Sequence, residues 1–154
     1  MSSYLTIYLV PKKTTSKYVY QAEKVEEIEI TKGIPLVYDS YSRSSDVYQA
    51  FWESLNPAYC GNEEKYTELT PAKVEEVLSD KREYISKIEF RLNTLYEILK
   101  TSGYSEELFS EILSTSEHLK EENKCLDSIK SIANIVNIIY EGYGDFEKVL
   151  INVD

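Results

Sequence analysis

Two long helical segments are predicted in the second half of the chain, TPAKVEEVLSDKREYISKIEFRLNTLYEILKT at residues 70–101 and EELFSEILSTSEHLKEENKCLDSIKSIANIVNIIYE at residues 106–141. Thr70 can cap the first helix, and the proline after it suits the first helical position. Gly103 can supply a left-handed C-terminal turn, and Ser105 can cap the second helix. The sequence therefore predicts two consecutive helices joined by a very short connection.

Both segments carry apolar residues at alternating spacings of three and four, which is the pattern of a heptad seam. The first seam is Val74, Leu78, Lys81, Ile85, Ile88, Leu92, Leu95 and Leu99. The second is Ile112, Thr115, Leu119, Glu122, Leu126, Ile129, Ala133, Val136 and Tyr140. The short connection forces the arms to run antiparallel with their seams facing each other. We therefore expect a helical hairpin over residues 70–141 that buries Leu92, Leu95 and Leu126.

Further apolar residues on the two arms, at Phe90, Tyr96, Ile132 and Ile139, indicate that the base of the hairpin also packs on the rest of the chain. A two-helix hairpin alone buries little surface, and tertiary packing supplies most of the stability of helices in proteins. We therefore expect a second layer against the hairpin.

Short segments rich in β-branched and aromatic residues predict that layer. They are Tyr4–Val10, Tyr18–Tyr20, Val25–Ile30, Leu36–Tyr38 and Phe146–Val153. We expect about four of these strands to form one small, mostly antiparallel sheet that brings the two ends of the chain together. Residues 58–69 show no clean period, and we expect them to be a loop over the core.

A short helix is predicted between the strands and the hairpin, with Ser44 or Ser45 as its cap and Asp46 at its positive end. The overall expectation is an α+β fold in a single domain, residues 1–154. Its parts are mainly strands at 1–43, the short helix at 44–56, the hairpin at 70–141 and a C-terminal strand at 146–153.

Negative charge is concentrated in the second half of the chain. The net charge is −10, and the first 62 residues contribute almost none of it. Such a field repels phosphate backbones and anionic membranes, whereas it attracts and steers a basic protein surface. We expect no direct binding to nucleic acid or membrane. The alternative is that the acidic helices only keep the protein soluble.

Cys60 and Cys125 lie far apart, without neighbouring Cys or His at a metal-ligand spacing, so the sequence predicts reduced thiols with neither a disulfide framework nor a metal site. The N-terminus lacks the pattern of a secretory signal, and the apolar run at 132–140 is interrupted by two asparagines. We expect a cytoplasmic protein.

No motif with a catalytic mechanism is present. His118 is the single histidine, and it stands in a polar stretch near Glu111 and Glu117, where we expect it to be an exposed helix residue. Phosphate-binding glycine loops, zinc-protease motifs and acidic calcium loops are also lacking. We expect a protein that is not an enzyme and needs no cofactor.

The most distinctive local cluster is the stretch from Asp39 to Asp46, which includes Tyr41 and Arg43 and leads to Tyr48. Free N–H groups at a helix start, an arginine and several hydroxyls could hold an anion, a nucleotide or a carboxylate of a partner. The alternative is that the serines only cap the helix and Arg43 pairs with Asp39 or Asp46.

The opening stretch at residues 4–12, the element at 40–48 and the acidic hairpin together resemble uncharacterised small acidic accessory proteins of bacteriophages and prophages. The resemblance is one of pattern over most of the chain. It implies a non-enzymatic binder of a host protein in the cytoplasm of the bacterial host. Inhibition of a bacterial defence system such as a CRISPR nuclease is one version of that role.

The leading hypothesis is therefore a non-catalytic protein that binds a basic protein surface. The candidate binding residues are Tyr41, Arg43, Tyr48, Glu76, Glu83, Glu107, Glu111 and Glu121. One alternative is a structural or virion-associated protein that forms homo-oligomers through the hairpin seam. A second alternative is a small protein that binds an anion or a nucleotide through the Arg43 cluster.

Overall fold

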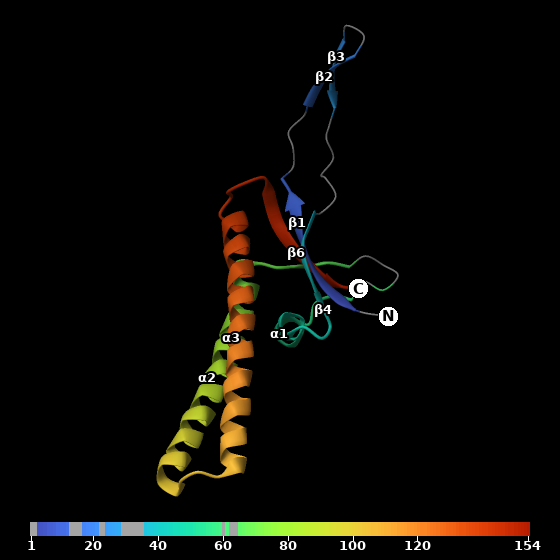
Figure 1. Ribbon diagram of the computed structural model, residues 1–154. Helices are drawn as coiled ribbons and strands as arrows, with labels where there is room; N and C mark the ends of the chain where they lie inside the picture. Colours follow the sequence, from blue (N-terminus) through green and yellow to red (C-terminus); the bar gives the residue numbers. More distant parts are fainter. Residues whose placement is uncertain (1–2, 13–16, 22–23, 29–35, 60, 62–64) are drawn as a thin grey trace.

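The computed structural model describes residues 3–12, 17–21, 24–28, 36–59, 61 and 65–154. Figure 1 shows a small sheet and a short helix at one end of a long helical hairpin. The elements in chain order are β1 (Tyr4–Pro11), β2 (Lys17–Gln21), β3 (Lys24–Ile28), β4 (Leu36–Ser42), α1 (Asp46–Leu55), β5 (Thr67–Glu68), α2 (Pro71–Ser102), α3 (Glu106–Tyr140) and β6 (Phe146–Val153). The predicted α+β class is confirmed.

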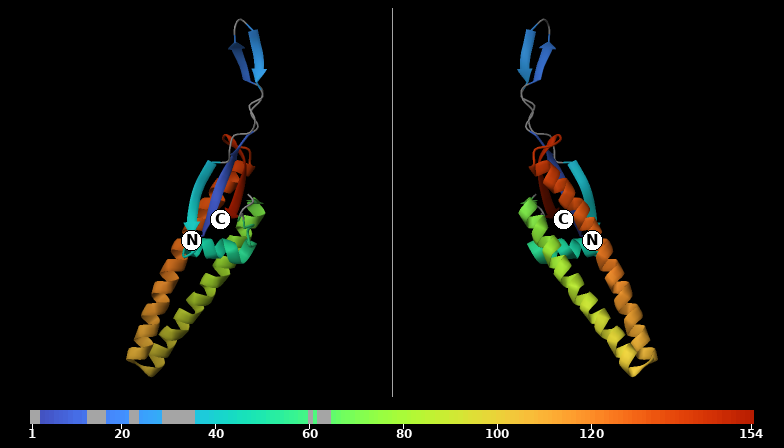
Figure 2. Two further views of the ribbon diagram at one scale, coloured as in Figure 1. Left: turned by 90° about the vertical axis from the view of Figure 1, so that its right-hand side faces the viewer. Right: turned by 90° about the vertical axis from the view of Figure 1, so that its left-hand side faces the viewer.

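The hairpin begins and ends where its capping residues predict. The Thr70 side chain accepts the Lys73 N–H, and the Ser105 side chain accepts the Leu108 N–H at 3.1 Å. Between the arms, Gly103 has a φ of 78°, a conformation that disfavours residues with a Cβ. The arms run antiparallel, side by side in all three views (Figures 1 and 2), and their distal half extends beyond the sheet and α1.

The two seams pack against each other as expected. Leu95 is 6% and Leu126 8% exposed, whereas Leu92 is only half-buried. Ile132 and Ile139 are buried at the base. The same expectation was wrong for two residues, since Phe90 is 75% and Tyr96 41% exposed. Both lie on the distal half of α2, where no other layer of the fold reaches them.

The main sheet has the strand order β4-β1-β6-β5, with every pair antiparallel. Leu5 and Ile7 of β1 and Ile151 of β6 are buried in a core with Phe51 of α1 and Ile129 of α3. The sheet thus packs on the base of the hairpin.

The first and last strands of the described chain lie side by side in the middle of this sheet, as predicted. β1 pairs with β6, and the Asp154 N–H donates to the Tyr4 carbonyl at 3.0 Å while the Tyr4 N–H donates to the Asp154 side chain at 3.0 Å. The sheet therefore depends on residues from opposite ends of the described chain.

Two strand predictions need correction. β2 and β3 pair with each other in a separate two-stranded sheet and do not join the main one. The fourth strand of the main sheet is β5, within the segment expected to be a loop, because Thr67 and Glu68 pair with Ile151 and Leu150. The predicted strand residues 29 and 30 lie outside the described residues.

α1 connects the sheet to the hairpin. Ser45 caps it through the Val47 N–H, and Asn56 ends it in a left-handed conformation with a φ of 46°. Val47 and Phe51 are buried in the core, and the Ser54 hydroxyl donates to Asp80 of α2 at 2.8 Å. α1 therefore braces the base of the hairpin and leaves the distal half free.

None of the helices in the described part of the chain combines the length and apolar character that a transmembrane span requires.

Candidate functional site

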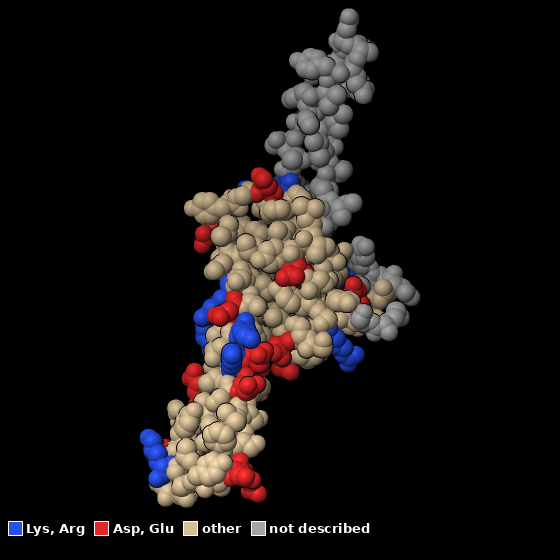
Figure 3. Space-filling view, in the orientation of Figure 1, with Lys and Arg blue, Asp and Glu red and all other residues tan. Residues whose placement is uncertain are grey.

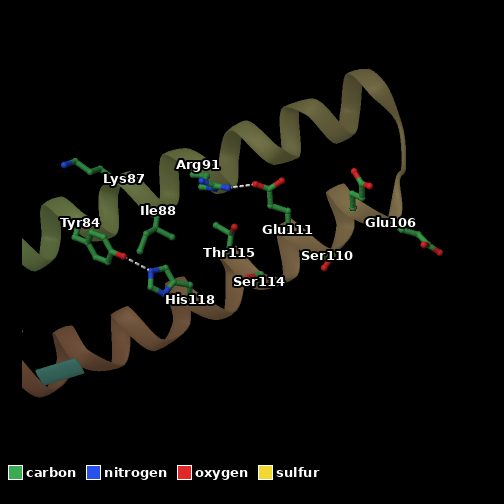
Figure 4. A pocket seen from close by; sticks show the side chains of 11 residues that line it. Tyr84, Lys87, Ile88, Arg91, Glu106, Ser110, Glu111, Ser114, Thr115 and His118 are labelled. Atoms are coloured by element: carbon green, nitrogen blue, oxygen red, sulfur yellow. Dashed lines mark hydrogen bonds and ion pairs between the residues drawn. The ribbon is translucent and has the colours of Figure 1, made fainter. Parts of the chain in front are cut away.

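A trough of about 1020 Å³ runs between the two arms in the distal half of the hairpin (Figure 4). α2 contributes one wall, with Tyr84, Lys87, Ile88 and Arg91. α3 contributes the other, with Glu106, Glu107, Ser110, Glu111, Ser114, Thr115 and His118. The α2 wall carries two cationic side chains, and the α3 wall carries three carboxylates. We refer to this feature as the hairpin trough.

Two polar contacts cross the trough. The Tyr84 hydroxyl and His118 Nε2 form a hydrogen bond at 2.9 Å, and Arg91 forms an ion pair with Glu111 (Figure 4). The Arg91 and Glu111 side chains are 65% and 44% exposed, so solvent screens their attraction and the pair adds little stability. Both contacts link the arms at the surface, above the buried seam.

The trough does not assemble a nucleophile and a base. A catalytic serine would need the imidazole within hydrogen-bond reach and a third group to orient that ring. Among the described residues, the hydrogen bond of the His118 side chain goes to Tyr84, and neither a serine nor a carboxylate bonds to the ring. The arrangement is that of an exposed polar surface.

The distal third of α3 concentrates the charge of the hairpin. Glu106, Glu107, Glu111 and Glu117 lie in its first turns, and neither Lys nor Arg occurs between Thr101 and Leu119. The remainder of α3, up to Tyr140, carries equal numbers of acidic and basic residues. Two of the predicted binding residues, Glu107 and Glu111, thus belong to one local field in the projecting part of the molecule.

A second hollow, of about 420 Å³, lies between α1 and the hairpin base and contains Glu83. Asp46 and Glu53 of α1 line it together with Asp80 of α2. Figure 3 shows acidic side chains gathered at this level, next to basic ones. Lys81 and Lys87 also line the hollow, and the Lys87 ammonium lies 3.8 Å from the Glu83 carboxylate. The negative charge of this hollow is therefore partly neutralised within the protein.

The other two predicted acidic residues lie apart from both hollows. Glu76 is exposed on the first turns of α2. Glu121 is exposed on α3 and pairs with Lys124 at 3.4 Å. The structure therefore brings together Glu107 and Glu111 but spreads the remaining acidic candidates over the surface.

Arg43 and Tyr48 line a third hollow, of about 250 Å³, beside the start of α1. Tyr48 is 5% exposed and stacks on Trp52 with ring centroids 6.3 Å apart, so it offers a partner little surface. Arg43 is exposed, and within the described residues its guanidinium forms no ion pair, so the alternative in which it pairs with Asp39 or Asp46 is not observed. The Asp39 carboxylate instead accepts the Ser40 N–H at 2.8 Å.

Tyr41 lies on β4 and packs partly against the core, away from that hollow. Burial, followed by interaction with the Asp39 carboxylate, raises the pKa of its hydroxyl well above the ordinary value. The helix start near Arg43 is already capped by Ser45, and the Ser42 and Ser44 hydroxyls bond to each other at 3.1 Å. The groups proposed to hold an anion are thus largely engaged within the protein.

No group of three or more His, Cys, Asp and Glu residues in the described ranges is arranged to hold a metal ion. Cys125 of α3 is a buried free thiol. Cys60 lies outside the described residues.

Sequence reasoning did not identify Tyr84, Arg91 or His118 as neighbours, nor the exposed apolar residues of the distal hairpin. The partnership of Tyr84 and His118 joins positions 34 residues apart, and it follows only from the alignment of the two arms. The lack of basic residues between Thr101 and Leu119 was a readable signal for the charge of the same region.

The resemblance to small phage proteins stays a prediction, as do the function, partner and compartment inferred from it. The chain was compared with protein-family models, with curated proteins and with solved structures, and none of the three comparisons found a match.

Proposed function

We propose that this protein binds another protein and catalyses no reaction, and that the distal third of α3 faces a basic surface on the partner. The observation that carries the proposal is the uncompensated charge of Glu106, Glu107 and Glu117 on a helix that projects beyond the sheet and α1. Charges presented in this way steer encounter with a surface of opposite sign. A phage-encoded inhibitor of a bacterial defence protein, acting in the host cytoplasm, is one member of this class.

The hairpin is suited to this role because its distal half extends beyond the sheet and α1 and is left uncovered by them. Its seam residues Ile85, Leu95 and Ile112 are buried between the arms, and the caps at Thr70 and Ser105 fix the helix starts. A rigid element loses little conformational entropy on binding, so more of the contact energy contributes to affinity. The charged face is therefore presented in a defined geometry.

The first experiment is affinity capture from bacterial lysates at low salt, with two charge-reversed variants beside the wild type. The distal variant changes Glu106, Glu107 and Glu117 to Lys, and the matched variant changes Glu76, Glu83 and Glu121 to Lys, with the same change in net charge. A partner recruited by the distal field should be lost from the first variant and retained by the second.

Salt dependence provides the second readout. Because salt screens exposed charges over about 8 Å at physiological ionic strength, the affinity for the captured partner should fall as salt rises. If the two variants capture the same proteins as the wild type at every salt concentration, the acidic surface only serves solubility. If variants at Arg43 alone lose the partner, binding takes place at the sheet end.

A further inference from the structure

The outer side of α3, facing away from α2, carries an apolar stripe that the fold does not use. Phe109 is 46% exposed and Leu113 51% exposed, and neither belongs to the hydrophobic core. Next to them in the sequence, Ile112 is buried in the hairpin seam. Successive residues of a helix are rotated by about 100°, so Phe109 and Leu113, spaced by four, share one face.

Acidic residues lie at both ends of this stripe. Glu106 precedes Phe109 by three positions and Glu117 follows Leu113 by four, and both glutamates are exposed. Glu106 also lines the hairpin trough, so it stands at the border between the trough and the outer side of α3. At the distal end the Tyr104 ring, 69% exposed, lies 5.9 Å from the Phe109 ring. We call these residues, Tyr104, Glu106, Phe109, Leu113 and Glu117, the outer stripe of α3.

We propose that the outer stripe docks into an apolar groove on the partner protein that is bordered by Lys or Arg. This inference rests on the proposed function and names the surface that performs it. Phe109 and Leu113 act as the anchors of an amphipathic helix in a groove, while Glu106 and Glu117 meet the basic border at either end. Buried aromatic and aliphatic anchors of this kind supply most of the binding energy in such complexes.

The charges of the outer stripe favour a basic partner protein over a second copy of the chain or an anionic lipid surface. A second copy of this chain would place Glu106 or Glu117 against glutamates of the same stripe, in either orientation, and like charges at an interface oppose association. An anionic lipid surface would be repelled in the same way. A basic-bordered groove satisfies the apolar centre and both charged ends.

The test uses the full chain and a defined probe with the proposed chemistry. The probe is a synthetic amphipathic helical peptide with leucines on one face and lysines along its borders, and a peptide of the same composition in scrambled order is its control. Titration of the ¹⁵N-labelled protein at low salt should shift the amide signals of residues 104–117. The scrambled peptide should bind at least about tenfold more weakly.

A double variant, Phe109→Ser with Leu113→Ser, should lower the affinity for the peptide at least about tenfold. Its matched control is Phe90→Ser, which removes an even more exposed ring from α2 and should leave the affinity within about twofold. Unchanged affinity in the double variant, or shifts centred on other residues, would overturn the proposal. The shift map of the wild type decides the outcome even if the double variant is poorly folded.

Polylysine is a purely basic probe, so binding to it tests the acidic surface alone and distinguishes this proposal from the proposed function. If polylysine binds and the distal Glu→Lys variant does not bind it, while the double variant retains full affinity for the peptide, the acidic surface acts alone and the outer stripe has no part. If neither polylysine nor the peptide binds at low salt, both proposals fall. If light scattering instead detects self-association that the double variant abolishes, the stripe is assigned to a second copy of the chain. Binding to phosphatidylcholine vesicles that the double variant abolishes would assign the stripe to lipid.

Discussion

The Lys81 ammonium of α2 lies 2.6 Å from the Glu122 carboxylate of α3, inside the hairpin seam. Their side chains are 12% and 8% exposed, and the Tyr84 ring centroid lies 5.3 Å from the same ammonium. Each residue is the polar member of an otherwise mostly apolar seam. A buried polar pair adds little net stability, but it penalises any alignment of the arms that separates its members. We interpret the pair as the element that fixes the register of the hairpin.

Lys81→Met should lower the free energy of unfolding by about 3 to 5 kcal/mol, because it leaves the Glu122 carboxylate buried without its partner. The double variant with Glu122→Leu should recover most of that loss, since both members are then apolar. Urea denaturation of the wild type and of both variants measures the difference. A cost below about 1 kcal/mol for Lys81→Met would show that the carboxylate reaches water.

Stability should decrease between pH 9 and pH 11. Burial raises the pKa of the Cys125 thiol from 9.0 to about 11, so in this range the unfolded thiol ionises while the folded one stays neutral. The contribution is fully present below pH 9 and is lost as the pH rises towards 11, by about 2 to 3 kcal/mol. Burial also raises the pKa values of Tyr41 and Tyr140, which act in the same direction.

Urea denaturation at several pH values, with Cys125→Ala as the comparison, isolates the part due to the thiol. The alanine variant should be less stable at pH 7, because it leaves a cavity, yet its stability should fall less steeply above pH 9. Parallel curves for the two proteins would mean that the thiol does not contribute.

Leu95→Ala should cost about 2 to 5 kcal/mol, as expected for a buried leucine. Leu92→Ala should cost less, because Leu92 is only half-buried in the same seam, whereas Leu95 is 6% exposed. Thermal and urea unfolding of the two variants test the order. An equal or larger cost at Leu92 would mean that the seam turns differently in this part of the hairpin.

Tyr140→Phe should reduce stability by about 1 to 2 kcal/mol. The Tyr140 hydroxyl donates to Glu68 at 2.7 Å and accepts the Val149 N–H at 3.4 Å, so it ties the end of α3 to β5 and β6. Tyr143→Phe, at a position that is 66% exposed, is the matched control and should be neutral. Calorimetry of both variants measures the contribution of the hydroxyl.

The hairpin could be predicted closely from the sequence because its signals are local. Thr70, Gly103 and Ser105 mark its boundaries, and the spacing of the seam residues gives the face of each arm. β5 could not be predicted, since its two residues become a strand only by pairing with β6. The prediction that Phe90 packs on the rest of the chain was wrong for a related reason. Its apolar character does not show how far along the hairpin the sheet and α1 extend.

The candidate site was predictable in its charge but not in its geometry. Glu107 and Glu111 were identified from composition, and the structure brings both to the hairpin trough. Phe109 and Leu113 follow the same helical spacing as buried residues, and only the position of α2 on the opposite side shows that they are exposed. A pattern of apolar residues thus identifies a face, whereas the tertiary arrangement decides whether that face is covered.

The pairing of β1 with β6 sets an order for the appearance of structure during synthesis. Tyr4 and Asp154 are 150 positions apart, so β1 leaves the ribosome long before its central partner exists, whereas the two arms of the hairpin meet across a short turn. Contacts between distant residues form slowly because a long loop has to close. The hairpin is therefore expected to be helical first. Until β6 is made, β1 can pair with β4 along one edge, while its other edge stays open to capture by a chaperone or another nascent chain.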